Sequence, residues 1–344
     1  MALLWWDGFD NVSYVSWVPS QQLWEYFDNN FMWVISSNYN GVTPRFGTGK
    51  ILATRAGGDK IRSASFGNKT EVIVGFAFYI TSTTITDYEH FALMDGATTQ
   101  VEFRFTSSRE IKVTRAGTQI GITATNVWAI NTWHYLEIKV KINNATGTVD
   151  IRLDGNSILS LTGQDTQVTA NAYANRFQFR ALGNTPNIGI DDMYVVDLTG
   201  SQNNSWLGEI RVRQGYPGAD GDVNDFTASA GNRWACVDEE VPSDTDYIYS
   251  GTVNHKQLFS LASLSLTGSI AAVRLVFRDY KSDTGFRKMK GLWKVGGTEY
   301  LDTEVVLKVT PLYWGETREL NPATSAPWIA SEVTGSQFGV KVTA

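Results

Sequence analysis

The stretch from Thr132 to Asn156 constrains this chain most, because it reads as two β-strands joined by a short turn. Its apolar residues fall on alternate positions: Leu136, Ile138, Val140 and Ile142, then, after the turn at 143–147, Val149, Ile151 and Leu153. The positions between the first four carry Glu137, Lys139 and Lys141. Period two predicts half-buried strands with a charged outer face. A slip of one residue would expose every aliphatic side chain, so the pairing is well specified.

Glu71–Ile80 predicts a central strand, because both sets of alternate side chains are apolar or small. Shorter strand patterns follow it, separated by turn signals such as Asp95-Gly96. The predicted strands are Phe91–Met94, Val101–Phe105, Ile111–Thr114, Gln119–Thr123 and one that contains Phe177 and Phe179. Closely spaced strands without intervening helical patterns indicate a sandwich or jelly roll.

Composition narrows the class of protein. The chain has 344 residues, 42% of them hydrophobic and 19% charged, which suits two globular domains of ordinary size. A net charge of -6 and the lack of a basic run argue against nucleic acid as the main partner. No stretch approaches the ~20 apolar residues of a membrane span. The N-terminal MALLWWDGFD has no basic or long apolar region, so we expect no signal peptide.

The chemistry-bearing residues are sparse. Cys236 is the one cysteine, so an internal disulfide is excluded, and we expect it to be a small buried hydrophobe. His90, His134 and His255 are far apart and form no zinc-ligand pattern. Glucanases of jelly-roll type place acidic residues two apart on a strand, and no such Glu-x-Asp-x-Glu strand is present here. We therefore expect no enzyme activity.

Three short motifs resemble a known fold family. They are Trp133-His134-Tyr135 with the hairpin that follows, the opening WWDGFD, and the closing run 190–195, IDDMYV. In this order and separation they resemble the laminin-G-like domains of the concanavalin A-like lectin and glucanase class. The resemblance implies a jelly roll over residues 1–200, and it implies a fold more than an activity.

Some domains of this kind bind calcium, and the resemblance implies a place for it. If the first and last strands pair, Asp7, Asp10, Asp191 and Asp192 come together, and hard carboxylate oxygens suit calcium. We name Asp10 and Asp191 as candidate ligands, against the alternative that all four are ordinary turn and edge carboxylates. Asp220, Asp222 and Asp225 form a second acidic loop that lacks the EF-hand register.

The second half of the chain forms a separate β module. Ser201–Ser205 is the expected linker, and the module spans 206–344. Expected strands are Gly208–Gln214, Asp246–Tyr249, Ile270–Tyr280, Leu292–Val295, Thr303–Thr310 and Phe338–Thr343. A short helix is expected to start at Ser325–Trp328 and stop at Gly335. The segments GEIRVRQGYPGADGD, GNRWACVDE and PWIASEVTGSQFGVKV resemble a C-terminal module of tailed-phage structural proteins.

The opening 70 residues are crowded with aromatic side chains: Trp5, Trp6, Phe9, Tyr14, Trp17, Trp24, Tyr26, Phe27, Phe31 and Trp33. We expect most of them to pack the ends of the sandwich or a subunit contact. The alternative is a platform on which sugar rings stack.

Together these features favour an all-β, two-domain, non-enzymatic structural protein of a tailed-phage virion, assembled in the host cytoplasm. It would serve in a tail fibre or baseplate, which we favour, or as capsid decoration. The expected partners are other virion proteins, further copies of itself and a host-surface glycan, with no cofactor apart from the candidate calcium ion. The alternatives are a carbohydrate-binding adhesin, a polysaccharide depolymerase and an ordinary cellular lectin-like protein.

Overall fold

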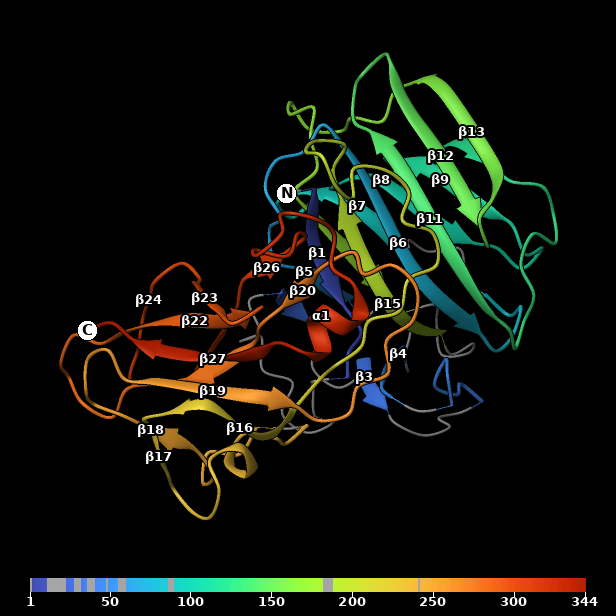
Figure 1. The fold of residues 1–344 in the computed structure, drawn as a ribbon. Coiled ribbons are helices and arrows are strands. Elements are labelled where there is room, and N and C mark those ends of the chain that lie inside the picture. Colours follow the sequence, from blue (N-terminus) through green and yellow to red (C-terminus); the bar gives the residue numbers. More distant parts are fainter. Residues whose placement is uncertain are drawn as a thin grey trace. The chain divides into compact units, whose positions relative to one another are not determined.

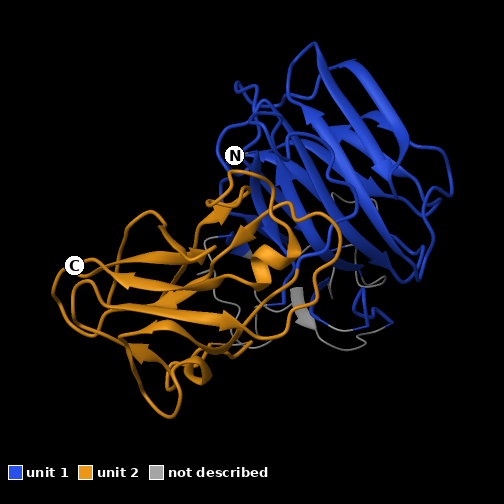
Figure 2. Cartoon of the chain, viewed as in Figure 1, with its two compact units in different colours: residues 1–212 blue, residues 213–344 orange. Residues whose placement is uncertain are grey.

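The computed structural model describes residues 2–10, 23–27, 32–35, 41–47, 49–54, 60–85, 90–181, 188–240 and 242–344. Across these ranges the chain is nearly all β, and the only α-helix is α1 (Ala330–Thr334). The chain divides into two compact units, Met1–Val212 and Arg213–Ala344 (Figure 2). The division falls after the linker expected at Ser201–Ser205, so residues 206–212 belong to the first unit.

Unit 1 is built from two antiparallel sheets. The first, here called the β6 sheet, runs in the order β13 (Asn156–Gln164), β12 (Gly147–Leu153), β11 (Trp133–Lys141), β6 (Glu71–Ile80), β15 (Ile188–Val196), β4 (Ile51–Thr54) and β3 (Met32–Ile35), and β1 (Leu3–Asp7) also pairs with β15. The second, the β7 sheet, runs β10 (Thr118–Ile122), β9 (Ile111–Arg115), β8 (Thr98–Phe105), β7 (Phe91–Asp95), β14 (Arg176–Arg180), β5 (Lys60–Ser63) and β2 (Trp24–Phe27).

The chain passes repeatedly between these sheets. It goes from β5 to β6 to β7, and later from β14 to β15, changing sheet each time. Strands that are neighbours in sequence therefore face each other across the core, which is the arrangement of a jelly-roll sandwich. The all-β sandwich expected from the sequence is confirmed.

The hairpin that dominates the sequence is also confirmed in register. Leu136, Ile138 and Val140 of β11 lie opposite the inward residues of β12, and β6 has the predicted bounds (Figure 1). β6 lies between β11 and β15, and nine of its ten residues are buried. It is central and covered on both faces because both sets of its side chains are apolar or small.

The aromatic start of the chain packs mainly into the core of unit 1. Trp5 contacts Trp24 and Phe177 edge to face, with ring centroids 4.9 and 4.7 Å apart, and Phe9 stacks on Trp24. All four rings are buried, as expected for packing at the end of a sandwich. Tyr14, Trp17 and Phe31 lie outside the described residues, as do the side chains of Phe27 and Trp33.

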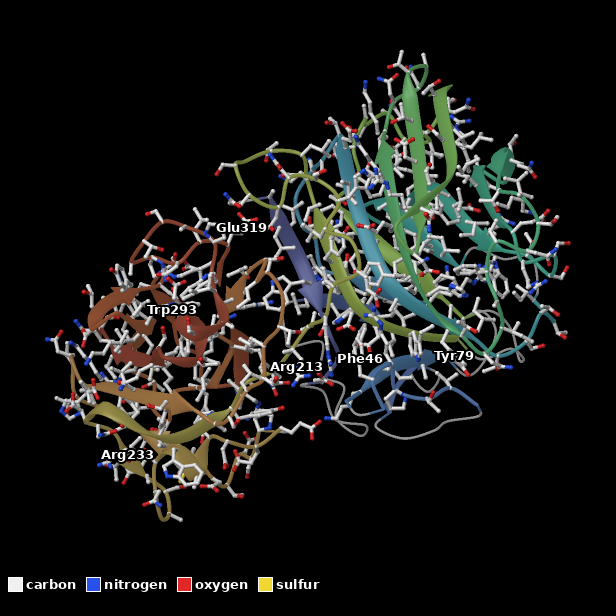
Figure 3. The ribbon with its side chains drawn as sticks, turned by 45° about the vertical axis from the view of Figure 1, so that its right-hand side comes forward. Phe46, Tyr79, Arg213, Arg233, Trp293 and Glu319 are labelled. Atoms are coloured by element: carbon white, nitrogen blue, oxygen red, sulfur yellow. The ribbon has the colours of Figure 1, made fainter. Side chains whose placement is uncertain are left out.

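Unit 2 is built around one larger sheet, here called the β22 sheet. Its strands are β16 (Pro217–Asn224), β19 (Lys256–Leu261), β27 (Gln337–Val342), β22 (Lys288–Val295) and β23 (Thr298–Leu301), with β24 (Val305–Val306) also paired to β22. Two-stranded ladders join β17 (Thr227–Ala228) to β18 (Ile248–Tyr249), β20 (Val273–Arg274) to β26 (Thr317–Arg318), and β21 (Phe277–Asp279) to β25 (Leu312–Trp314). Its core contains Trp293, labelled in Figure 3, stacked on Trp328.

Three expected elements of the second half differ from the structure. Gly208–Gln214 forms no strand, for reasons given with the site below. Ile270–Tyr280 is broken into β20 and β21, because β20 pairs with β26 while β21 pairs with β25. Of Thr303–Thr310, only Val305–Val306 is a strand.

The helix ends where it was expected but begins later. Gly335 is its C-cap. Pro327 and Trp328 are held extended by bridges to Leu320 and Ile270, so α1 starts at Ala330. Glu332 then accepts a hydrogen bond from the backbone N–H of Ile329 at 3.1 Å, which completes the first turn.

Candidate functional site

The first and last strands of unit 1 do pair, and this brings the predicted carboxylates to one region. β1 runs antiparallel to β15, with Asp7 opposite Met193. Asp7 accepts hydrogen bonds from the indole N–H of Trp24 at 3.0 Å and from the backbone N–H of Phe9 at 2.9 Å. Asp10 accepts one from the backbone N–H of Lys50 at 2.7 Å. These two carboxylates therefore fix the loops that follow β1.

Asp191 and Asp192 lie at a bulge of β15, and both are buried. Burial, followed by the negative charge of Asp192, raises the pKa of Asp191, and Asp10 adds to this. Burial also raises the pKa of Asp192, which the guanidinium of Arg45 opposes. Asp10 and Asp191 are thus close enough to repel each other. A cation beside them would relieve that repulsion, so calcium at Asp10 and Asp191 remains a prediction.

The described residues contain no group of three or more His, Cys, Asp or Glu side chains that could hold a metal ion. Any calcium ion at Asp10 and Asp191 would need further oxygen ligands, since calcium takes six to eight. Asp192 does not offer one readily, because it is bonded to Arg45 and to the backbone N–H of Val212 at 2.7 Å.

The segment 206–212 lies on the β6 sheet and is held there by side chains. Arg45 donates to the carbonyl oxygen of Ile210 at 3.0 Å and pairs with Glu209 as well as Asp192. Arg211 lies over the ring of Phe46, labelled in Figure 3, at 3.7 Å from the centroid. Four of its backbone groups, the N–H groups of Leu207, Gly208 and Val212 and the carbonyl of Ile210, bond to side chains rather than to a neighbouring strand, and no strand forms at Gly208–Gln214.

The sequence placed Glu137 on an exposed charged face, and this was wrong. Glu137 is 1% exposed, accepts a hydrogen bond from the hydroxyl of Tyr194, and accepts a second from the backbone N–H of Gly208 at 2.8 Å. The N–H of Leu207 in turn donates to the Tyr194 hydroxyl oxygen at 3.2 Å. Burial and the Glu137 charge raise the pKa of Tyr194. The docked segment therefore converts an outer strand position into a buried one.

The β7 sheet offers a different surface, because its outer side chains are mostly polar. Strand registers align six residues from six neighbouring strands into one row: Tyr26, Arg62, Gln178, Ala92, Glu102 and Thr114. We call this set the polar row. The alternate residues of the same strands, such as Phe177 and Phe103, point into the core. Successive strands lie ~4.8 Å apart, so the row extends over about 24 Å.

Cationic side chains flank the polar row on the same face. On one side, Lys60 lies opposite Arg180 and Lys112 lies opposite Arg104. On the other side is Arg176, which alternates with Gln178 along β14. Two carboxylates of this face, Glu25 and Glu102, pair with its cations.

Carboxylates hold several of these guanidinium groups in fixed positions. Glu25 Oε1 lies 2.9 Å from Arg62 Nε and accepts a hydrogen bond from Arg176 Nε at 2.7 Å. Glu102 accepts bonds from Arg104 and, at 2.8 Å, from the hydroxyl of Thr114. Arg62 also lies 5.3 Å from the centroid of the Tyr26 ring, which is 42% exposed. Tyr26 is thus the exposed member of the row and Arg62 and Glu102 are half-buried, whereas Gln178, Ala92 and Thr114 are buried.

The remaining predicted residues have structural partners. His134 accepts from the N–H of Ala129 through Nε2 at 2.9 Å, so its Nδ1 carries the proton shared with Asp154 at 2.7 Å. Cys236 is buried, as expected. Asp220 and Asp222 lie in β16 and not in a loop, and Asp222 pairs with Lys294.

Sequence reasoning missed the polar row. The signal was present within single strands, for example in the alternation of Phe177 and Phe179 with Gln178 and Arg180. The order of strands in the sheet, which puts Tyr26 in line with Thr114, is set by contacts far apart in the chain.

No family model matches this chain, and no curated protein matches its sequence. Similar solved structures include the alginate lyase Aly36B (10% identity, TM-score 0.39), where the match covers 56% of this chain and 96% of the lyase. They also include a carbohydrate esterase of the Shiga toxin-encoding bacteriophage phi24B (16%, TM-score 0.34, covering 55% and 98%) and lectin II from Ulex europaeus (10%, TM-score 0.32, covering 43% and 86%). No helix among the described residues is long and apolar enough to span a membrane.

Proposed function

We propose that this protein binds an extended, acidic glycan along the outer face of the β7 sheet and acts as a non-enzymatic adhesion component. The observation that carries the proposal is that Tyr26, Arg62 and Glu102, the first exposed and the other two half-buried, belong to one aligned row on a single face of the sheet. From Tyr26 to Glu102 the row crosses four strand spacings, about 19 Å, which suits a polymer better than a single sugar.

Each type of side chain in the polar row has a role in such binding. The ring of Tyr26 offers an apolar face to a sugar ring and a hydroxyl to its polar edge. Glu102, which is half-buried, can accept hydrogen bonds from sugar hydroxyls. The guanidinium of Arg62, held beside Glu25, presents a planar set of donors that matches a carboxylate. This match favours a glycan that contains sugar acids.

We place this adhesion on a tailed-phage virion, with the tail favoured over the capsid. This part of the proposal rests on the sequence resemblance of the second half to phage structural modules and on the absence of cysteine pairs in a lectin-like chain. Repeated copies would strengthen weak glycan contacts by avidity. Other virion proteins are the remaining expected partners.

The binding test uses the full chain on an array of neutral and acidic glycans. We expect binding to one class of acidic polysaccharide, and we expect Tyr26→Ala and Arg62→Gln each to weaken it about tenfold, as for loss of one aromatic or ionic contact. Tyr280→Ala is the matched control, because Tyr280 is 41% exposed in unit 2 and Tyr26 is 42% exposed. Equal binding by all three variants would reject the polar row as the site.

The same preparation separates adhesion from depolymerase activity. Incubation with the bound polysaccharide should leave its chain length unchanged, and release of oligosaccharides would replace adhesion by catalysis. The virion assignment needs its own measurement, namely an image of purified particles in which this chain is located. Its absence from particles would refute the virion role and leave the glycan site intact.

A further inference from the structure

One face of the β22 sheet in unit 2 carries an unusual concentration of lysines. Lys256 of β19 lies opposite Lys341 of β27, and Lys341 lies opposite Lys290 of β22. Three like charges therefore share one cross-strand row. Two more lysines, Lys288 and Lys294, project from the same face of β22, because they are two and four residues away from Lys290.

The outer lysines of this set are neutralised by carboxylates. Lys256 Nζ lies 2.6 Å from Glu299, and Lys288 Nζ lies 2.5 Å from Glu304. Lys294 pairs with Asp222. The positive charge of each of these three lysines is therefore balanced by a carboxylate.

Lys290 and Lys341, on the two neighbouring central strands, differ from the other lysines. Within the described residues, neither ammonium group makes a hydrogen bond or an ion pair. The pKa of Glu304 is lowered mainly by its hydrogen bond from Lys288, and the positive charge of Lys290 adds to this. Both lysines are half-buried, and the next row on this face contains the fully buried Leu258 and Leu292.

Two like charges directly opposite each other destabilise a sheet. The Cβ atoms of such a pair lie about 5 Å apart, so two flexible lysine stems can bring their ammonium groups to a single ligand. A tetrahedral oxyanion carries the two negative charges and the several acceptor oxygens that such a pair would satisfy. A chloride ion lacks both.

We propose that Lys290 and Lys341 form an anion-binding site for a phosphate or sulfate group. The group could be a free ion or a substituent on a polymer, since both present the same oxygens. This site lies in unit 2 and is independent of the glycan row in unit 1.

The test measures the affinity of the full chain for inorganic phosphate and sulfate at constant ionic strength, by calorimetric titration. We expect Lys341→Gln and Lys290→Gln each to weaken binding about tenfold, the usual size of one ionic hydrogen bond. Lys308→Gln is the matched control, because Lys308 is an exposed lysine of the same unit and its loss changes the net charge equally. We expect this control to bind as the unaltered chain does.

A folding defect is distinguished by thermal unfolding without added anion. Because the lysine pair is repulsive, Lys341→Gln should unfold at the same temperature as the unaltered chain or higher. Phosphate and sulfate stabilise proteins in general, so only a difference between Lys341→Gln and Lys308→Gln counts as specific stabilisation.

A second titration with dextran sulfate and neutral dextran identifies the source of the anion. Tighter binding per sulfate group on the polymer indicates a polymer substituent, and equal binding indicates a free ion. Equal affinity of the unaltered chain, Lys341→Gln and Lys308→Gln, or no measurable binding of either inorganic anion, would overturn the proposal.

Discussion

At the scale of single residues, Asp191 of unit 1 is a buried carboxyl group whose surroundings disfavour its charged form. It is buried beside Asp192 and close to Asp10, and its pKa is raised. A carboxyl group whose pKa is higher in the folded than in the unfolded protein stabilises the fold below about pH 4, where both states are protonated. That contribution is lost as the pH rises toward the raised folded-state value. Unit 1 should therefore be less stable at pH 8 than at pH 5 on account of Asp191.

Asp191→Asn should remove this pH dependence and raise the melting temperature at pH 8, which thermal unfolding at both pH values will measure. Asp150→Asn is the control, since Asp150 is a half-buried carboxylate of β12 that accepts a hydrogen bond from the hydroxyl of Ser160 at 2.6 Å. If calcium binds at Asp10 and Asp191, adding it at pH 8 should stabilise the unaltered chain and leave Asp191→Asn unchanged. A calcium response equal in both would exclude this pair as ligands.

Glu137 illustrates what the sequence can and cannot reveal at this scale. Its position in a strict alternation predicts exposure, and its neighbours Lys139 and Lys141 are indeed only half-buried. Residues 206–212, which cover Glu137, lie some seventy residues further along the chain, and the sequence of β11 gives no sign of them. The same reason hid the polar row, whose members come from strands spread from Tyr26 to Gln178.

At the scale of elements, the docked segment 206–212 depends on Arg45. Arg45 and Asp192 both have side chains 4% exposed, so Arg45→Gln leaves a buried carboxylate without its cation. We expect a loss of about 3 to 5 kcal/mol of stability, the usual result of breaking a buried ion pair. The amides of Leu207, Gly208 and Val212 should exchange hydrogen faster, because their acceptors lie on unit 1 side chains.

Hydrogen exchange on the full chain measures this prediction directly. Arg152→Gln is the control, because Arg152 contacts the same segment through the ring of Trp206, 4.3 Å from its centroid, and not through one of the three amides. Unchanged exchange at the three amides in Arg45→Gln would mean that the segment is held by other contacts.

Elements with strong local patterns could be predicted, and those defined by distant partners could not. The hairpin β11–β12 and the strand β6 carry their alternation in the sequence and match it in register. Ile270–Tyr280 carries an equally apolar pattern, yet it splits because its two halves pair with different strands. The start of α1 moved because Trp328 is buried in the core, which local helix signals do not encode.

At the scale of the whole molecule, we expect assembly of several copies. β10 lies at one end of the β7 sheet with half-exposed side chains, and such edges can pair with another chain. Sedimentation over a range of concentrations should then reveal species heavier than the 38.1 kDa chain. A single 38.1 kDa species at every concentration would contradict it and weaken the avidity argument.

The docking of residues 206–212 also determines where the chain can be divided when its first unit is joined to another protein. Suppose that recombination, natural or engineered, cuts the chain at the polar stretch near Ser205. Glu137 would then lose the segment that covers it, and Arg45 would lose its contacts with Ile210 and Glu209. The part of the chain that can be transferred intact is therefore the sandwich together with residues 206–212. Chimaeras joined after Val212 should contain a complete first unit.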